Sequence, residues 1–235
     1  MGVVYRAWDP RLQCIDAIKL ISEDTIPDED ARRQLEKEAQ IATSLDHPNI
    51  CRIKNFVDEP GQAGIVMEFV EGQVLTNLIP AQVCLPLDRV VFYGMEIARA
   101  VACAHEHGVV HRDLKSGNVM VTRDGHIKLL DFGLSKIQSR IEIPKSLDAP
   151  DSFHGSDGIA GTPPYLPPEV LRHCPSDTRS DIWSLGVLLY EMVSGQMPFK
   201  GATLIELGFA ILREPPLPLP EHVPASLSKI IHRCL

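Results

Sequence analysis

The sequence predicts an α+β fold in which strands dominate residues 1–70 and helices dominate the rest of the 235-residue chain. Two observations support this prediction. Short runs of β-favouring residues, bounded by Gly, Pro and Asp, fill much of the first part. Longer segments in which apolar residues recur at helical spacing follow them. The length allows one large domain or two small lobes, with enough residues to bury a core.

Composition excludes several classes of protein. The net charge is −8 and no run of Lys or Arg stands out, which argues against nucleic-acid binding. The six cysteines lie far apart without a C-x-x-C pair, as expected for thiols in a reducing compartment. The longest apolar run, 182–193, is interrupted by Ser184, Gly186 and Glu191 and is too short to span a membrane. Residues 1–10 do not form a signal peptide.

Four strands and one helix are predicted in the first part. The strands cover about 1–7, 14–21, 51–57 and 64–69, and a Pro-Gly turn joins the last two. The helix covers 31–45, where four apolar residues share one face: Leu35, Ala39, Ala42 and Leu45.

Glu38 lies on or beside the apolar face of this helix, where a carboxylate is costly unless it is paired. We expect its partner to be Lys19, near the end of the second strand. The alternative is that Glu38 is one more solvated charge among its charged neighbours.

Residues 111–133 hold the most informative polar cluster. Asp113 and Asn118 precede two short β-favouring runs, and Asp131 follows them. Asp124-Gly125 between the runs is a strong turn signal, so the runs are predicted to form a hairpin. A hairpin returns the chain to its starting point and brings Asp131 back beside Asp113 and Asn118. Grouped oxygen ligands of this kind suit Mg²⁺ that is bound together with substrate phosphates.

The same stretch matches H-R-D-x-K-x-x-N followed by D-F-G. It thereby resembles the catalytic core of eukaryotic-type (Hanks-type) serine/threonine protein kinases, most of all the bacterial members. The resemblance implies that Asp113 is the catalytic base, Asn118 a metal ligand and Asp131 the main Mg²⁺ ligand. A lysine at the position of Lys115 is the residue type seen in serine/threonine kinases. It supplies a cation that could stabilise a transferring phosphoryl group.

The resemblance implies a bilobal protein-kinase-like fold. A small antiparallel β-sheet lobe with one helix would cover 1–70, and a larger, mainly α-helical lobe would cover 71–235. Lys19 would lie on the lysine strand of the family and hold the nucleotide phosphates, and Glu38 would orient it from the helix that the family calls αC. The first strand, two glycines of the Gly-rich loop and the last helix of the family domain have no counterpart in this chain, so the domain is expected to be clipped at both ends.

ATP and Mg²⁺ are the implied cofactors. Gly2 and Val4 match the last glycine and the valine of the Gly-rich loop. Met67 would be the gatekeeper, and the backbone of Glu68 and Val70 would bind the adenine edge. The full set of implied ATP-binding residues is Gly2, Val4, Ala17, Lys19, Met67, Glu68, Val70 and Met120.

Four more helices are predicted after the first 70 residues. Residues 88–107 are strongly amphipathic, and the apolar residues that share a face are Val90, Tyr93, Ile97, Val101 and Ala104. Residues 180–194 are apolar nearly all round, with Ser180 as the expected cap. Further helices are expected over 203–212 and 226–235.

The long polar stretch after D-F-G ends in G-T-P-P-Y-L-P-P-E and is the activation loop by resemblance. Ser152 and Ser156 are the best-placed phosphate acceptors, and Arg112 could pair with the phosphate. The alternative for both serines is ordinary loop polarity. Thr162 is expected near Asp113 and Lys115 instead.

Several residues have implied structural roles: His111, Phe132, Gly133, Glu169 and Asp181. Asp181 would accept hydrogen bonds from the catalytic loop and orient the turn at 111–112. Glu169 is expected to lack the arginine that the family places in its last helix, because Arg233 comes too early in the sequence to match it.

We therefore expect a serine/threonine kinase that uses ATP and protein substrates. It would be cytoplasmic, or the cytoplasmic part of a longer membrane-anchored protein. One alternative is a truncated domain or pseudokinase that binds nucleotide or acts as a scaffold. Another is a small-molecule phosphotransferase, although the P-P-E segment and Gly161-Thr162 favour a protein substrate.

Overall fold

The computed structural model describes residues 3–21, 29–59, 62–80, 83–132 and 164–235. These residues group into two compact units. One comprises the described residues up to Leu78 and from Asp88 to Phe132; the other comprises residues 79–80, 83–87 and 164–235. The predicted hairpin and the helix before it are in the same unit as the N-terminal sheet, and the lobe boundary at residue 70 stays a prediction.

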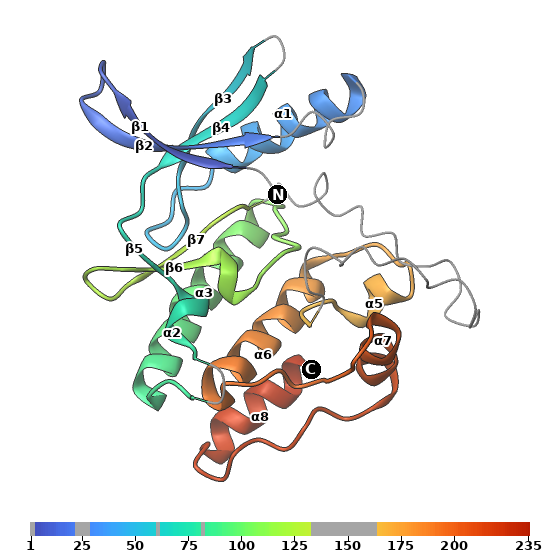
Figure 1. The fold of residues 1–235 in the computed structure, drawn as a ribbon. Coiled ribbons are helices and arrows are strands. Elements are labelled where there is room, and N and C mark those ends of the chain that lie inside the picture. The colour runs from blue at the N-terminus through green and yellow to red at the C-terminus, as the bar shows by residue number, and fades with distance from the viewer. Residues whose placement is uncertain (1–2, 22–28, 60–61, 81–82, 133–163) are drawn as a thin grey trace. The chain divides into compact units, whose positions relative to one another are not determined.

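The N-terminal sheet has four antiparallel strands in the order β1-β2-β4-β3 (Figure 1). The strands are β1 Val4–Asp9, β2 Cys14–Ile21, β3 Ile53–Glu59 and β4 Gln62–Glu68. All four predicted strands are confirmed, with ends that differ by a few residues. The register sets Val4 opposite Lys19 on one side of β2 and Ile65 opposite Lys19 on the other. Lys19 therefore lies on a central strand, between two neighbours.

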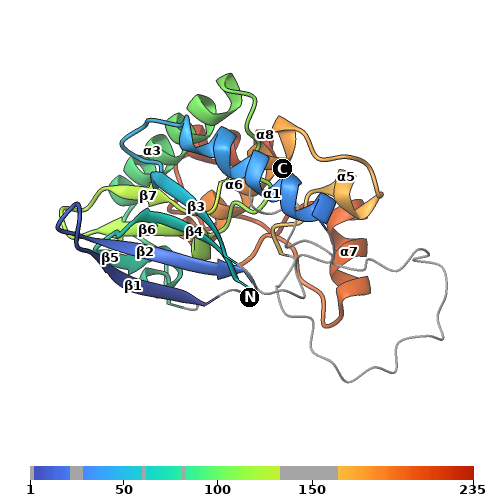
Figure 2. The same ribbon diagram turned by 90° about the horizontal axis from the view of Figure 1, so that it is seen from above.

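Helix α1, Glu29–Thr43, lies along this sheet near β3 and β4 (Figure 2). On its predicted apolar face, Ala39 and Ala42 are buried, as is Leu45 just beyond the helix. The residues that form the core between sheet and helix are Ala17, Ala42, Cys51, Ile53, Ile65 and Met67. The core holds the central strand β2 in place, because burying these side chains removes apolar area from water.

A second, three-stranded sheet contains the predicted hairpin. Its strands are β5 Gly72–Val74, β6 Val119–Thr122 and β7 Ile127–Leu129, in the order β5-β6-β7. Gly125 adopts a positive φ of 87° in the turn and donates its N–H to Thr122 O at 3.0 Å. A residue with a Cβ rarely adopts that backbone conformation, which explains why Asp124-Gly125 predicted the turn correctly.

Two helices accompany the second sheet: α2, Leu75–Leu78, and α3, Leu87–Glu106. The apolar face predicted for α3 is buried at every position: Val90, Tyr93, Ile97, Val101 and Ala104. The helix ends at Glu106, and Gly108 just beyond it has a φ of 73° and donates its N–H to His105 O. This C-cap lets the chain turn directly into residues 109–118.

The second unit is helical and is organised around α6, Thr178–Ser194, which is buried nearly all round. The other helices among its described residues are α5 Pro168–Leu171, α7 Leu204–Arg213 and α8 Ala225–Cys234. Helices α6 and α8 lie side by side (Figure 1). A Cβ on Gly186 would lie 2.6 Å from Cys234 Cβ, so this close approach requires glycine.

The predicted cap of α6 was wrong. The N-cap is Asp177, whose Oδ1 accepts the N–H of Arg179 at 2.8 Å. Ser180 lies in the first turn, is buried, and bonds to another segment. Asp and Ser are both good caps, so the sequence alone did not distinguish them. Among the described helices, none combines the length and apolar content needed to cross a membrane.

Candidate active site

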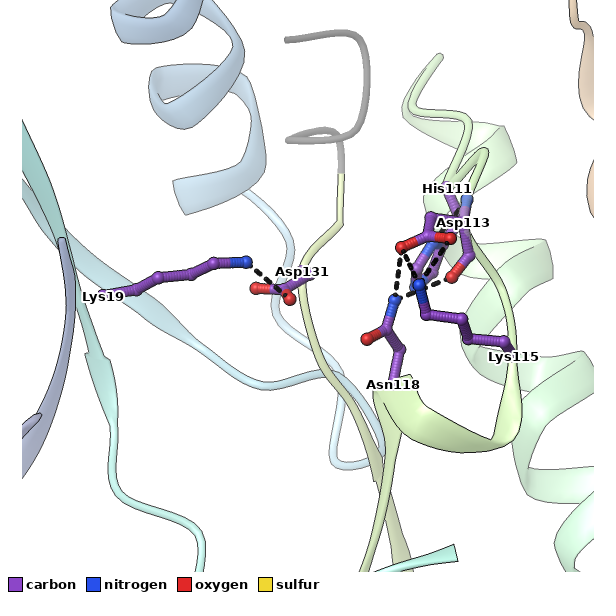
Figure 3. Close-up of polar contacts among 6 residues, drawn as sticks. All are labelled: Lys19, His111, Asp113, Lys115, Asn118 and Asp131. Carbon is purple, nitrogen blue, oxygen red and sulfur yellow. Dashed lines mark hydrogen bonds and ion pairs between the residues drawn. The ribbon is translucent and has the colours of Figure 1, made fainter. Parts of the chain in front are cut away.

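Residues 109–118 bring three of the predicted polar side chains together (Figure 3). Lys115 Nζ lies 2.9 and 2.8 Å from the two carboxylate oxygens of Asp113. Asn118 donates from Nδ2 to Asp113 Oδ2 at 2.9 Å and to the Asp113 carbonyl oxygen at 2.7 Å. Leu114, which follows Asp113 in the chain, is fully buried and anchors the loop, which ends in the short 3₁₀ helix η2, Ser116–Asn118.

The hairpin returns Asp131 to this loop, as predicted. Leu130 donates its N–H to the carbonyl oxygen of Asn118 at 2.9 Å, so the residue before Asp131 is bonded to the predicted metal ligand. Lys19 Nζ reaches Asp131 Oδ2 at 2.7 Å and is only 7% exposed. The inward direction predicted for Lys19 is therefore confirmed.

The partner predicted for Lys19 was Glu38, and the contact that the structure gives is with Asp131. The side chain of Glu38 lies outside the described residues, so the Lys19–Glu38 pair stays a prediction. An amine can serve both carboxylates in turn, because the Lys side chain is long and carries three donors.

Two residues of the site adopt the left-handed backbone conformation. Arg112 has a φ of 65° and Asp131 a φ of 62°. Asp tolerates this conformation better than most residues, whereas Arg does so less readily. Each such residue costs on the order of 1–3 kcal/mol, and strain of this kind clusters at functional sites. Here it turns the chain sharply just before Asp113 and at Asp131.

A ring contact between His111 and Phe132 joins the loop at 109–118 to the segment that follows the hairpin. Their rings lie 4.5 Å apart between centroids at 54°, and both residues are buried. His111 Nδ1 accepts the N–H of Asp113 at 3.3 Å, which favours the tautomer with its proton on Nε2. The structural roles predicted for His111 and Phe132 thus have a physical basis in this contact.

The oxygen atoms left over by these contacts fit a hard cation. Asn118 uses its amide nitrogen toward Asp113, and Figure 3 shows its amide oxygen pointing away from that carboxylate. Asp131 uses Oδ2 toward Lys19. Among the described residues no donor is bonded to Oδ1 of either side chain. Amide and carboxylate oxygens are ligands that Mg²⁺ accepts when phosphates complete its coordination.

The predicted adenine-binding residues lie on β2, β4 and the segment after β4. Ala17 faces Met67 in register, and both are buried. The Glu68 carboxylate accepts the N–H of Arg52 at 2.9 Å and contacts Lys128 Nζ at 2.5 Å. These bonds fix the chain just before Val70. Two further predicted residues lie on other strands: Val4 on β1, where it is exposed, and Met120 on β6, where it is half-buried.

Five predicted residues lie outside the described residues: Gly2, Gly133, Ser152, Ser156 and Thr162. The roles assigned to them stay predictions. The same holds for the pairing of Arg112 with a loop phosphate.

In the helical unit, Glu169 has a partner of another kind than the arginine considered above, and the expected lack of that arginine stays a prediction. Ser180 donates its hydroxyl to Glu169 Oε1 at 2.6 Å. No pattern in the sequence joins Glu169 to this serine in the first turn of α6. Asp181, next to Ser180, is fully buried, and its predicted bonds to the catalytic loop stay a prediction.

Sequence reasoning missed Glu96. This residue is 7% exposed on α3, and its Oε2 accepts the N–H of Ile127 at 2.9 Å. Its Oε1 lies 2.7 Å from His126 Nδ1, and this carboxylate raises the pKa of His126. The signal was available, because Glu96 lies beside the apolar face of its helix, the same reasoning that singled out Glu38.

Comparisons with known proteins agree with this geometry. The family model described as "Protein kinase domain" matches residues 1–235. A probable serine/threonine-protein kinase of Clostridium perfringens is 32% identical over 238 residues, which cover 100% of this chain and 33% of that protein. Serine/threonine-protein kinase pkn3 of Myxococcus xanthus is 33% identical over 243 residues, covering 100% and 43%. PknB of Mycobacterium tuberculosis is 31% identical over 222 residues, covering 93% and 34%. The chain spans about a third of the length of most of these relatives.

Proposed function

The chain belongs to the protein kinase domain family, and we propose on this basis that it transfers the γ-phosphate of ATP to serine and threonine hydroxyls of proteins. The observation that carries the proposal is the placement of one group of three side chains and one ion pair. Asp113 lies between Lys115 and Asn118, and Asp131 lies against Lys19. Relatives named serine/threonine-protein kinase support the choice of hydroxyl substrate.

In the proposed reaction, Asp113 orients the substrate hydroxyl and accepts its proton. The hydroxyl oxygen forms a bond to the γ-phosphorus while the bond from that phosphorus to the ADP oxygen breaks. Lys115, beside Asp113, offsets the charge of the γ-phosphate. Most of the acceleration would come from positioning and charge stabilisation, because little covalent chemistry is required of the protein.

Asn118 and Asp131 would hold Mg²⁺, which neutralises charge on the ATP phosphates when it is bound. Lys19 would hold the α- and β-phosphates, and Glu38 would orient it. A nucleotide that takes over the amine of Lys19 also frees Asp131 Oδ2 for the cation. Before nucleotide binds, the ion pair between Lys19 and Asp131 would keep these two side chains aligned in the site.

The nucleotide base would lie against Ala17 and Met67, with the backbone of Glu68 and Val70 at the adenine edge. Gly2, Val4 and Met120 would complete that pocket. Ser152 or Ser156 would accept an activating phosphate and Arg112 would bind it. The six free cysteines fit a reducing, cytoplasmic compartment. For the whole protein, too, we propose ATP and proteins that carry Ser or Thr as the substrates.

Two other functions make different predictions. A nucleotide-binding domain without activity would bind ATP but label no substrate. A small-molecule phosphotransferase would label small alcohols and not proteins. The intact set of Lys19, Asp113, Lys115, Asn118 and Asp131 favours an active enzyme.

A radiolabelled-ATP assay separates these functions. The chain is incubated with Mg²⁺, labelled ATP and either a Ser/Thr peptide library or a panel of small alcohols. We expect label in peptides and none in the alcohols. Asp113→Asn should slow peptide labelling by about 10²–10⁴-fold, the usual contribution of a general base. The matched control is Asp46→Asn, at an exposed residue that has no role in the proposed reaction, which should label at the rate of the unaltered chain. Label in the alcohols alone would refute the proposal.

A further inference from the structure

The buried carboxylate of Glu96 has no part in the function proposed above, yet both of its contacts are at the start of β7. Its Oε2 accepts the Ile127 N–H at 2.9 Å, and its Oε1 lies 2.7 Å from His126 Nδ1. Strand β7 leads directly into Asp131. A charged side chain that is 7% exposed needs such partners, because an isolated buried carboxylate is strongly disfavoured.

Strand β7 is at the edge of its sheet, so its outward N–H and C=O groups need partners other than a strand. The segment 49–51 supplies most of them. Asn49 Nδ2 donates to Ile127 O at 2.9 Å, Asn49 O accepts from Leu129 N at 2.8 Å, and Cys51 N donates to Leu129 O at 2.8 Å. Glu96 completes the row at the Ile127 N–H, where helix α3 passes the strand (Figure 1).

The chain after Ile127 carries this anchoring to the site. Ile127 and Leu129 are fully buried, Leu130 bonds to Asn118 O, and Asp131 then adopts its left-handed conformation against Lys19. A strained residue keeps its conformation only when its surroundings hold it there. The anchored strand is one part of those surroundings, and Asn118 and Lys19 are the others.

We propose that Glu96 is a positioning residue for the Mg²⁺-binding residue Asp131. By accepting the Ile127 N–H, it fixes the start of β7 and thereby the distance of Asp131 from Asn118. The importance of this distance for catalysis rests on the proposed kinase function, whereas the anchoring of β7 does not. His126 contributes less to this anchoring than the Ile127 N–H does, because its ring is exposed. The ring also packs against that of Phe92, with 5.5 Å between the two centroids.

The substitutions Glu96→Leu and Glu96→Gln separate the acceptor from the bulk of the side chain. Leucine fills similar space but leaves the buried Ile127 N–H without an acceptor. Glutamine keeps one oxygen for that N–H. Glu106→Leu is the matched control, because Glu106 is an exposed residue on the same helix.

Two quantities are measured for each variant. The first is amide hydrogen exchange across 126–132, and the second is the Mg²⁺ concentration for half-maximal ADP binding, by calorimetry. Glu96→Leu should exchange at least tenfold faster at 127–130 and require about tenfold more Mg²⁺, the scale of one lost bond to a charged group. ADP binding without Mg²⁺ should not change. Glu96→Gln should stay within about threefold of the unaltered chain, and Glu106→Leu should match it.

Unchanged exchange at 127–130 in Glu96→Leu would overturn the proposal, as would equal acceleration in Glu106→Leu. If the unaltered chain binds no nucleotide, the kinase function fails while the exchange data still decide the anchoring. If Glu96→Leu does not fold, the Ile127 amide of the unaltered chain supplies the test. It should exchange far more slowly than the amides of turn residues 123–125, and equal rates would show that the bond to Glu96 does not form.

Discussion

Leu130 donates its backbone N–H to the carbonyl oxygen of Asn118 at 2.9 Å, which ties the end of the hairpin to the loop that precedes it. The bond joins main-chain atoms only. The side chains of the two predicted metal ligands, Asn118 and Asp131, therefore take no part in this link between their segments. Substitution of either side chain should remove a ligand without displacing the other residue.

Replacement of Lys19 by methionine tests the buried amine. Methionine keeps most of the length and the apolar contacts but cannot bind Asp131 or a phosphate. We expect peptide phosphorylation to fall by about 10²–10³-fold, the usual cost of losing one preorganised charge contact to the transition state. Initial rates of label transfer measure the effect. Lys37→Met, an exposed position on α1, is the control and should label normally.

The hydrogen bond from Ser180 to Glu169 should contribute measurably to stability. Ser180 is 2% exposed, and Ser180→Ala removes its hydroxyl donor. The carboxylate oxygen Oε1 of Glu169 then loses this hydrogen bond. We expect the free energy of unfolding to fall by about 1–3 kcal/mol, as for a lost hydrogen bond to a charged group. Urea denaturation measures this. Ser226→Ala, at an exposed position, should change it by less than about 0.5 kcal/mol, and equal effects would show that the Ser180 bond contributes nothing.

The contact between His126 and Glu96 should make stability depend on pH. Glu96 raises the folded-state pKa of His126 above its ordinary value of 6.5, first through the hydrogen bond and then through the charge. Protonated His126 therefore stabilises the fold. This contribution is complete below about pH 6.5 and is lost as the pH rises through the higher folded-state pKa.

Unfolding free energies of the unaltered chain and of His126→Asn, measured from pH 5 to pH 9, should thus differ most at the acid end. His222→Asn, on an exposed loop, reports the general effect of the same replacement. A difference that stays constant across the range, or grows toward alkaline pH, would contradict the assigned contact.

Cys51 should react slowly with thiol reagents. It is buried in the core of the N-terminal sheet, and burial raises its pKa to about 12. Because the thiolate is the reactive form, little of it exists at pH 8. Mass spectrometry after alkylation should find the exposed Cys84 and Cys174 modified first. Early modification of Cys51 in the folded chain would show that this core is open.

Elements with strong local signals could be predicted from the sequence. Asp124-Gly125 fixed the hairpin because a glycine readily takes the positive φ of that turn. The face of α3 through Val90 and Ile97 followed from helical spacing alone, since both residues are fully buried. The hairpin then placed Asp131 near Asn118, so the centre of the candidate site was predictable from two local patterns and a motif.

Contacts that depend on how segments meet could not be predicted in the same way. Asp177 and Ser180 are equally plausible caps, and only the position where α6 begins distinguishes them. The partner of Glu169 is a serine from another element, and no pattern in the sequence joins the two. Glu96 was detectable as a carboxylate beside an apolar face, but its acceptor role depends on a backbone N–H, which leaves no mark in the sequence.

In the proposed reaction, phosphate transfer from ATP depends most directly on Asp131 holding a divalent cation. The direct measurement is the rate of γ-phosphate label transfer to Ser/Thr peptides as Mg²⁺ is titrated, in the unaltered chain and in Asp131→Asn. We predict Mg²⁺-dependent labelling in the unaltered chain and a loss of about 10³-fold or more in the variant, since a bound cation supplies several kcal/mol of charge stabilisation. Equal rates in the two proteins, or labelling that does not depend on Mg²⁺, would contradict the account.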